Sequence, residues 1–150
     1  APTAETVWKR GGENERKTDA LHACMATPVL RGDHIYGVCS YGELRCLERA
    51  TGRRVWEDLT AVDKARWANI HMVQNGDITW MFNEHGELII GRLLPEGFQE
   101  ISRAKLIEPT TEQMKRKDQG VTWSHPAYAN GHVFIRSDKE LLCADLREKR

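Results

Sequence analysis

The chain has 150 residues, with 22 Lys and Arg against 22 Asp and Glu, so its formal net charge at pH 7 is zero. This balance argues against a nucleic-acid partner, because binding by phosphate neutralisation needs an excess of basic residues. The hydrophobic content of 40% is typical of a globular protein. No run approaches the roughly 18 apolar residues that a membrane-spanning helix needs, and residues 1–10 lack the apolar region of a signal peptide.

In chain order, short apolar runs separated by turn residues recur with a period of about 44 residues, which is the signature of a repeat protein. The three copies begin at Gly32-Asp33-His34, Gly76-Asp77-Ile78 and Gly131-His132-Val133. Each copy continues into a second shared stretch, which reads Gly42-Glu43-Leu44, Gly86-Glu87-Leu88 and Lys139-Glu140-Leu141. Three copies of one unit therefore account for most of the chain.

The first copy predicts four short β-strands joined by glycine-containing hairpin turns, over residues 27–30, 34–39, 43–47 and 53–56. Four antiparallel strands in each unit of about 40–50 residues are typical of a β-propeller blade. The helices of ankyrin and tetratricopeptide repeats are not expected, because the glycine and β-branched residues disfavour them. The fold class is therefore predicted to be all-β.

These units divide the whole chain into propeller segments. We predict a leading strand of another blade, blade one, blade two, a polar surface insertion and blade three, over residues 5–9, 25–58, 68–105, 109–120 and 122–146. The leading strand is inferred because Val7-Trp8 repeats Val55-Trp56. A closed propeller needs at least about four blades. We therefore expect either a piece of a longer protein or two copies that exchange residues 5–9 to complete one ring.

One stretch of blade one resembles a known family. Residues 46–56, from Cys46-Leu47-Glu48 to Trp56, are similar to the A-L-D-x-x-T-G-K-x-x-W motif of PQQ-like propeller blades. Such blades occur in quinoprotein alcohol dehydrogenases and in the outer-membrane assembly lipoprotein family. Several further segments resemble the C-terminal part of PQQ-binding-like propellers of planctomycete-type bacteria, namely Leu21-His22, Thr27-Pro28-Val29, residues 36–42, residues 86–90 and residues 124–129.

The resemblance implies structural roles and a location. In such blades the motif tryptophan and glycine dock neighbouring blades on each other, which assigns that role to Trp8, Gly52 and Trp56. It also implies an extracytoplasmic location, periplasmic or secreted. Quinoprotein dehydrogenases of this kind bind PQQ and Ca²⁺ in a closed ring and use a catalytic Asp and usually a vicinal Cys pair. This chain has no adjacent cysteines and no Asp or Asn cluster with Ca²⁺-ligand spacing. We therefore predict no catalytic residue and no cofactor, with PQQ and Ca²⁺ compatible only with an intact propeller.

A polar ring at the central channel is the predicted binding site. His71 and His125 occupy the same repeat position on the first strand of their blades, and Thr27 is their counterpart in blade one. The ring is completed by a cation and aromatic faces from Arg66, Trp67 and Trp123. These side chains either bind a small ligand or peptide, or bond loop carbonyls and pack between blades. No metal site is predicted, because histidines of different blades are expected to lie too far apart to share Zn²⁺.

The four cysteines are interpreted as structural. His22 precedes Cys24 without the further groups that a catalytic pair needs. Cys46 and Cys143 hold equivalent third-strand positions and are expected to be small buried residues. If Tyr41-Gly42 is a two-residue turn, Cys39 faces Leu44, and a disulfide between Cys39 and Cys46 is possible. The basic runs at 115–117 and 147–150 are interpreted as solvated surface.

The predicted function is a non-catalytic binding or scaffold module. Its channel face or residues 109–120 would contact a protein or saccharide partner. The alternative is the C-terminal part of a PQQ-dependent dehydrogenase, or of another propeller enzyme, whose active site lies upstream.

Overall fold

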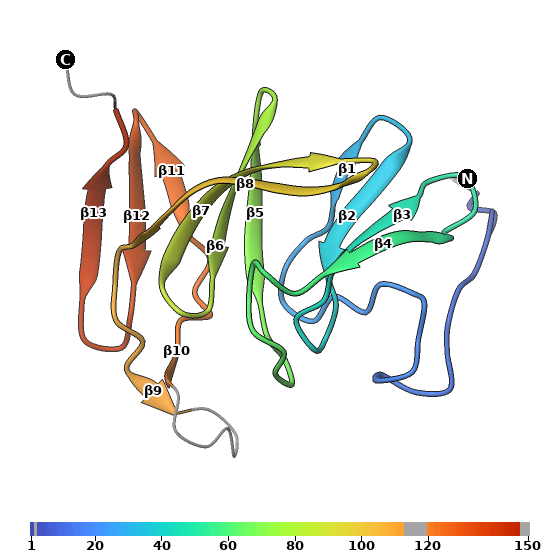
Figure 1. Cartoon of the computed structure of the whole chain (residues 1–150), viewed down its shortest axis with the longest axis horizontal. Coiled ribbons are helices and arrows are strands. Elements are labelled where there is room, and N and C mark those ends of the chain that lie inside the picture. Colours follow the sequence, from blue (N-terminus) through green and yellow to red (C-terminus); the bar gives the residue numbers. More distant parts are fainter. Residues whose placement is uncertain (2, 113–119, 148–150) are drawn as a thin grey trace.

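The computed structural model describes residues 1, 3–112 and 120–147, and these residues form strands and loops without a helix (Figure 1). The predicted all-β class is confirmed. Three antiparallel sheets of three or four strands stand side by side in Figure 1, and consecutive strands are neighbours in each sheet. Within the described part of the chain, no helix is long and apolar enough to cross a membrane.

Blade one is the four-stranded sheet nearest the N-terminus, with β1 on one edge and β4 on the other. Its strands are β1 (Val29–Arg31), β2 (His34–Val38), β3 (Leu44–Glu48) and β4 (Arg54–Asp58). Gly32 and Gly42 have φ values of 57° and 93° in the first two turns, a region that favours glycine. Each turn therefore reverses the chain at the position where the sequence places a glycine.

The turn between β2 and β3 is one residue longer than expected. Val38 pairs with Leu44, Cys39 N–H donates to Glu43 O, and Gly42 N–H donates to Cys39 O. The prediction that Cys39 faces Leu44 is therefore wrong. Side chains alternate between the two faces of a strand, so the shift places Cys39 and Cys46 on opposite faces of blade one. The possible disulfide is excluded by this arrangement, and both cysteines are free.

Blade two repeats the same order with longer strands, and its first strand carries His71. They are β5 (Ile70–Asn75), β6 (Ile78–Asn83), β7 (Glu87–Leu94) and β8 (Gly97–Lys105). The antiparallel order matches that of blade one. In both blades the register between the third and fourth strands shifts, at Cys46/Leu47 and at Ile90/Gly91.

Blade three has three strands, β11 (Ala127–Ala129), β12 (His132–Arg136) and β13 (Leu141–Asp145). The segment leading into it contains a short antiparallel pair, β9 (Thr111–Glu112) and β10 (Gly120–Val121). The middle of the predicted insertion, with the basic run at 115–117, lies outside the described residues, as do residues 148–150 of the second basic run.

Two apolar clusters hold the three sheets together. Tyr36, Val38 and Leu44 of blade one pack against Met81 and Ile89 of blade two. The second cluster joins blades two and three, and its buried members are Phe82, Leu88, Ile107, Val133 and Ile135. Each blade thus buries one face against the next, as stacked repeats do.

The N-terminal segment differs from the expectation. Residues 5–9 form no strand, and the segment's backbone pairing is the isolated bridge between Gly12 and Thr18. A strand forms only where a neighbouring edge supplies the ladder hydrogen bonds, and none of the described strands does so here. Instead, Ala20 and Leu21 cover the outer face of blade one, where a Cβ added to Gly37 would lie 2.5 Å from Leu21 Cδ2.

Candidate binding site on the linker face

One end of the stacked sheets carries the β2–β3, β6–β7 and β12–β13 turns together with the segments that lead into each blade. We call this end the linker face; β9, β10 and the β12–β13 turn mark it at the lower side of Figure 1. The six predicted channel residues all belong to segments that enter or begin the first strand of a blade, namely Thr27, Arg66, Trp67, His71, Trp123 and His125. Five of them form two groups, and Thr27 is exposed.

The first group is a histidine joint between blades two and three. The ring centroids of His71 and His125 lie 4.5 Å apart, so the expectation that such histidines are distant is wrong. They approach because the linker that carries His125 is hydrogen-bonded to blade two, through Thr122 N–H and Glu84 O. His71 is 3% exposed, and its Nε2 lies 3.0 Å from Trp123 O. His125 is exposed, with Nδ1 2.8 Å from Pro126 O. This bonding matches the packing alternative more closely than an open ligand ring.

The histidine joint is expected to make the chain less stable in acid. Burial, with a smaller contribution from the charge of His125, lowers the pKa of His71 from its ordinary value of 6.5. The unfolded chain therefore binds more protons below pH 6.5, and stability falls as the pH drops through 6.5 toward the lowered folded value. Chemical denaturation at several pH values should show a larger acid loss for wild type than for His71→Gln. His132→Gln, at a half-buried histidine bonded to Asn130 O, should keep the wild-type loss.

The second group lies between blades one and two. Trp67 adopts a φ of 62°, unusual for a bulky residue, and its N–H donates to Ser40 O. The Arg66 guanidinium lies 4.4 Å from the centroid of the Trp67 ring, a cation–π distance. Arg66 also pairs with Glu15 at 3.0 Å. The turn and the N-terminal segment thus hold this aromatic residue and its cation in one place.

A cavity of about 210 Å³ opens beside this pair, lined by Arg16, Tyr41, Glu43 and Lys64. Arg16 Nε donates to Tyr41 Oη at 2.8 Å, and the Tyr41 hydroxyl donates to Glu15 Oε1 at 3.1 Å. Lys64 Nζ lies 3.3 Å from Glu43 Oε1. The hydrogen bond with Tyr41 raises the pKa of Arg16, so this guanidinium stays charged. The cavity therefore holds two cations and one carboxylate: Lys64 is paired with Glu43, whereas Arg16 bonds a neutral hydroxyl.

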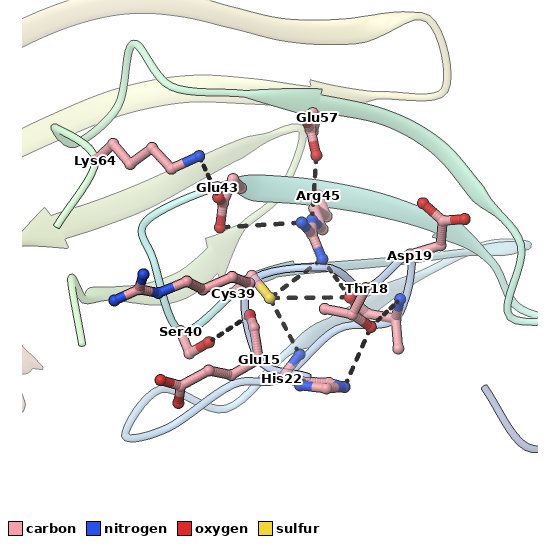
Figure 2. A network of polar contacts seen from close by, with 12 residues as sticks. Glu15, Thr18, Asp19, His22, Cys39, Ser40, Glu43, Arg45, Glu57 and Lys64 are labelled. Atoms are coloured by element: carbon pink, nitrogen blue, oxygen red, sulfur yellow. Dashed lines mark hydrogen bonds and ion pairs between the residues drawn. The ribbon is translucent and has the colours of Figure 1, made fainter. Parts of the chain in front are cut away.

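Behind the cavity lies a buried polar network, shown in Figure 2. Arg45 is 3% exposed, and its guanidinium lies 4.0 Å from Glu43 and 3.4 Å from Glu57. The same guanidinium donates to Ala20 O and to Cys39 Sγ, the latter at 3.2 Å. Arg45 therefore ties the N-terminal segment to the outer face of blade one.

Blade two has a similar arrangement, in which a glutamate pairs with an arginine that also bonds a backbone carbonyl. We call this arrangement the clamp; blade two builds it with residues from other positions. Arg103 pairs with Glu87 at 2.7 Å and donates to Thr60 O at 2.8 Å. Asn83, the counterpart of Cys39, donates from Nδ2 to Ala61 O at 3.1 Å. Burial alone would raise the pKa of Glu87, but the hydrogen bonds from Asn83 and Arg103 outweigh it and lower the pKa. Sequence reasoning missed the clamp, although the repeated Gly-Glu-Leu stretch contained its carboxylate.

The three predicted docking residues lie at the opposite end of the sheets. Trp8 Nε1 donates to Arg49 O at 2.8 Å, and Trp56 Nε1 donates to Leu94 O at 3.0 Å. Each carbonyl belongs to the turn region between the third and fourth strands of the blade that follows. Trp56 also packs on Tyr36, with ring centroids 5.9 Å apart.

Gly52→Ala is expected to destabilise the chain by more than Gly32→Ala. Both glycines have positive φ, 68° and 57°, so both alanine variants should carry a similar backbone cost of about 1 kcal/mol. A Cβ at Gly52 would lie 2.5 Å from the Trp8 ring, whereas nothing lies within 4 Å of one at Gly32. Equal losses in urea denaturation would show that Trp8 does not dock there in solution.

The remaining sulfur and histidine groups show structural contacts. His22 Nε2 lies 3.4 Å from Thr18 Oγ1, while the Cys24 thiol donates to the backbone carbonyl of His22. The imidazole ring is therefore not the hydrogen-bond partner of the Cys24 thiol. Burial, with a contribution from Cys39, raises the pKa of Cys24. Cys46 is buried as expected, but Cys143 is exposed, because it lies on the face of blade three that no other blade covers in the described chain. Within the described residues no group of three His, Cys, Asp or Glu side chains could hold a metal ion.

Comparison with known proteins agrees with this architecture. Residues 3–58, less than half of the chain, match the family model described as outer membrane protein assembly factor BamB, which supports the PQQ-like repeat in blade one. No curated protein matches the chain significantly. Among solved structures, BamB from Moraxella catarrhalis is similar, with a TM-score of 0.50 and 19% identity over 78% of this chain. The chain spans 30% of the length of that protein. The three stacked sheets therefore have the β-propeller fold.

Proposed function

We propose that this chain is part of a non-catalytic β-propeller module that binds a protein partner through the linker face of blades one and two. The observation that carries the proposal is the cavity beside the Arg66–Trp67 pair, lined by Arg16 and Lys64. The matching family model describes an outer membrane protein assembly factor, which supports a protein rather than a small molecule as partner. The same likeness supports an extracytoplasmic location.

The chemistry of the cavity favours carboxylates of that partner. Arg16 bonds the neutral Tyr41 hydroxyl and so keeps its charge available for a carboxylate, which guanidinium groups bind with paired hydrogen bonds. A saccharide is less well matched. Sugars stack on open aromatic faces, and Arg66 already lies over the face of Trp67.

Hexaglutamate is a suitable probe of this site. We expect fluorescence anisotropy of the labelled peptide to show saturable binding that weakens with salt, because exposed charges are screened. Arg16→Gln should weaken binding about tenfold, the scale of a lost charge-assisted hydrogen bond. Arg92→Gln, at an exposed arginine on β7, is the matched control and should leave the affinity unchanged. Equal binding of hexalysine, or no effect of Arg16→Gln, would contradict the proposal.

A PQQ-dependent enzyme is the competing function, and no observation of this structure favours it. The described residues contain no donor set of three acidic, His or Cys side chains for a metal, and the candidate histidines bond backbone, amide or hydroxyl groups. PQQ added with Ca²⁺ to the purified chain should give no saturable absorbance change. A stoichiometric micromolar titration would favour the enzyme instead.

A further inference from the structure

The joints between blades share one contact on the linker face. The linker entering blade two places Trp67 so that its N–H donates to Ser40 O, in the β2–β3 turn of blade one. The linker entering blade three does the same at the β6–β7 turn of blade two, where Thr122 N–H donates to Glu84 O. There the Trp123 indole also donates from Nε1 to Glu84 Oε2 at 2.9 Å. In both joints the turn of one blade receives a tryptophan-bearing segment that leads into the next.

Blade three offers the same seat. Ser137 N–H donates to Glu140 O as Cys39 N–H donates to Glu43 O, so Asp138 is the counterpart of Ser40 and Glu84. A cavity of about 330 Å³ lies at this place, lined by Val121, Thr122, Trp123, Ser124, Arg136, Ser137 and Asp138. Thr122 is 3% exposed, and its hydroxyl has no hydrogen-bond partner in the described structure. The cavity is therefore a polar seat with a carboxylate at the position where blade two uses Glu84. Asp138 Oδ2 already accepts a hydrogen bond from Thr110 Oγ1 at 3.3 Å, so an incoming donor would meet the other carboxylate oxygen.

The adjoining face of blade three has the composition of a joint. Phe134 pairs with Cys143 in the register in which Tyr36 pairs with Cys46 in blade one. Tyr36 and Leu44 are 1% and 0% exposed beneath blade two, whereas Phe134 and Leu141 are 39% and 76% exposed. One position departs from the pattern. Arg136 stands where the equivalent faces have the apolar residues Val38 and Phe82.

We propose that this face and its cavity bind a further β-propeller blade. The linker entering that blade places a tryptophan in the cavity, its indole N–H donating to the Asp138 carboxylate. An acidic group of that blade meets Arg136, because a buried guanidinium needs a carboxylate partner.

A second copy of this chain does not meet these requirements. Its linker to blade one, residues 12–28, contains no tryptophan. Its outer face is already covered by Ala20 and Leu21, with the Arg45 cation behind them. The inference is independent of the proposed carboxylate site between blades one and two, which lies at the other end of the described chain.

The segment that blade two already receives supplies the probe. A labelled peptide with the sequence of residues 120–126, GVTWSHP, should bind the intact chain saturably with a Kd below about 1 mM in fluorescence anisotropy. The peptide with alanine in place of tryptophan should lose saturable binding. Asp138→Asn should weaken binding about tenfold, whereas Asp33→Asn, at an exposed carboxylate on the β1–β2 turn, should not change it.

Two results would overturn the inference. One is the absence of saturable GVTWSHP binding, or binding that Asp138→Asn leaves intact. The other is a stable dimer of the wild-type chain in sedimentation analysis that Asp138→Asn disrupts, since a second copy would then occupy the seat. Hexaglutamate binding tests the carboxylate site separately, so either proposal can fail while the other stands.

Discussion

Replacing Arg45 with alanine is expected to lower the free energy of unfolding by about 3–5 kcal/mol, the usual cost of removing one partner from a buried ion pair. Arg45 is 3% exposed and Glu43 is 6% exposed, so the variant would leave a buried carboxylate with Lys64 as its remaining cation. The Ala20 carbonyl would lose its charged donor as well. Urea denaturation of both proteins measures the loss.

Arg53→Ala is the matched control for this experiment. Arg53 pairs with Glu48 at 3.7 Å, but its side chain is 64% exposed, so its removal should cost less than about 1 kcal/mol. Ile89 holds the equivalent position in blade two, so Arg45→Ile would give blade one the apolar residue that blade two has there. If Arg45→Ala and Arg53→Ala behaved alike, the network in Figure 2 would not hold the N-terminal segment in place.

Trp56→Ala is expected to cost about 3 kcal/mol, near the lower end for large aromatic residues because Trp56 is half-buried. The variant loses the ring contact with Tyr36 and the hydrogen bond to Leu94 O. It therefore weakens the joint between blades one and two at its outer edge. Thermal unfolding at fixed protein concentration is a suitable measurement.

Two further variants separate the contributions to the stability loss of Trp56→Ala. Val55→Ala removes an adjacent side chain that is 41% exposed, and it should cost less than about 1 kcal/mol. Trp56→Phe keeps an aromatic ring but removes the indole N–H, so it should lose about 1 kcal/mol for one hydrogen bond. If Trp56→Ala cost no more than Val55→Ala, the tryptophan would not join the blades.

The sequence predicted the sheets because their signals are local. Repeated glycines mark turns such as the one at Gly32, and the apolar runs between them give the strands. The β2–β3 register was missed by one residue. Tyr41-Gly42 looks like a complete turn, and the longer loop shows only in the structure, in the pairing of Val38 with Leu44 and the hydrogen bond from Gly42 N–H to Cys39 O.

The candidate site was less predictable, because it depends on contacts between distant segments. Arg66 and Trp67 were predicted as channel residues, but their contacts with Glu15 and Ser40 come from separate parts of the chain. The clamp was harder still, because blade one takes its arginine from β3 and blade two takes its arginine from β8. Aligning the repeats compares equivalent positions only. It does not detect an arginine that lies on a different strand in each blade.

The tryptophan contacts at the outer edge run in one direction. Trp8 reaches a carbonyl of blade one, and Trp56 reaches a carbonyl of blade two, so each anchor precedes its target in the chain. During synthesis from the N-terminus, every such anchor leaves the ribosome before the turn that it will hold. Each new blade can therefore fold against a tryptophan that has already been synthesised.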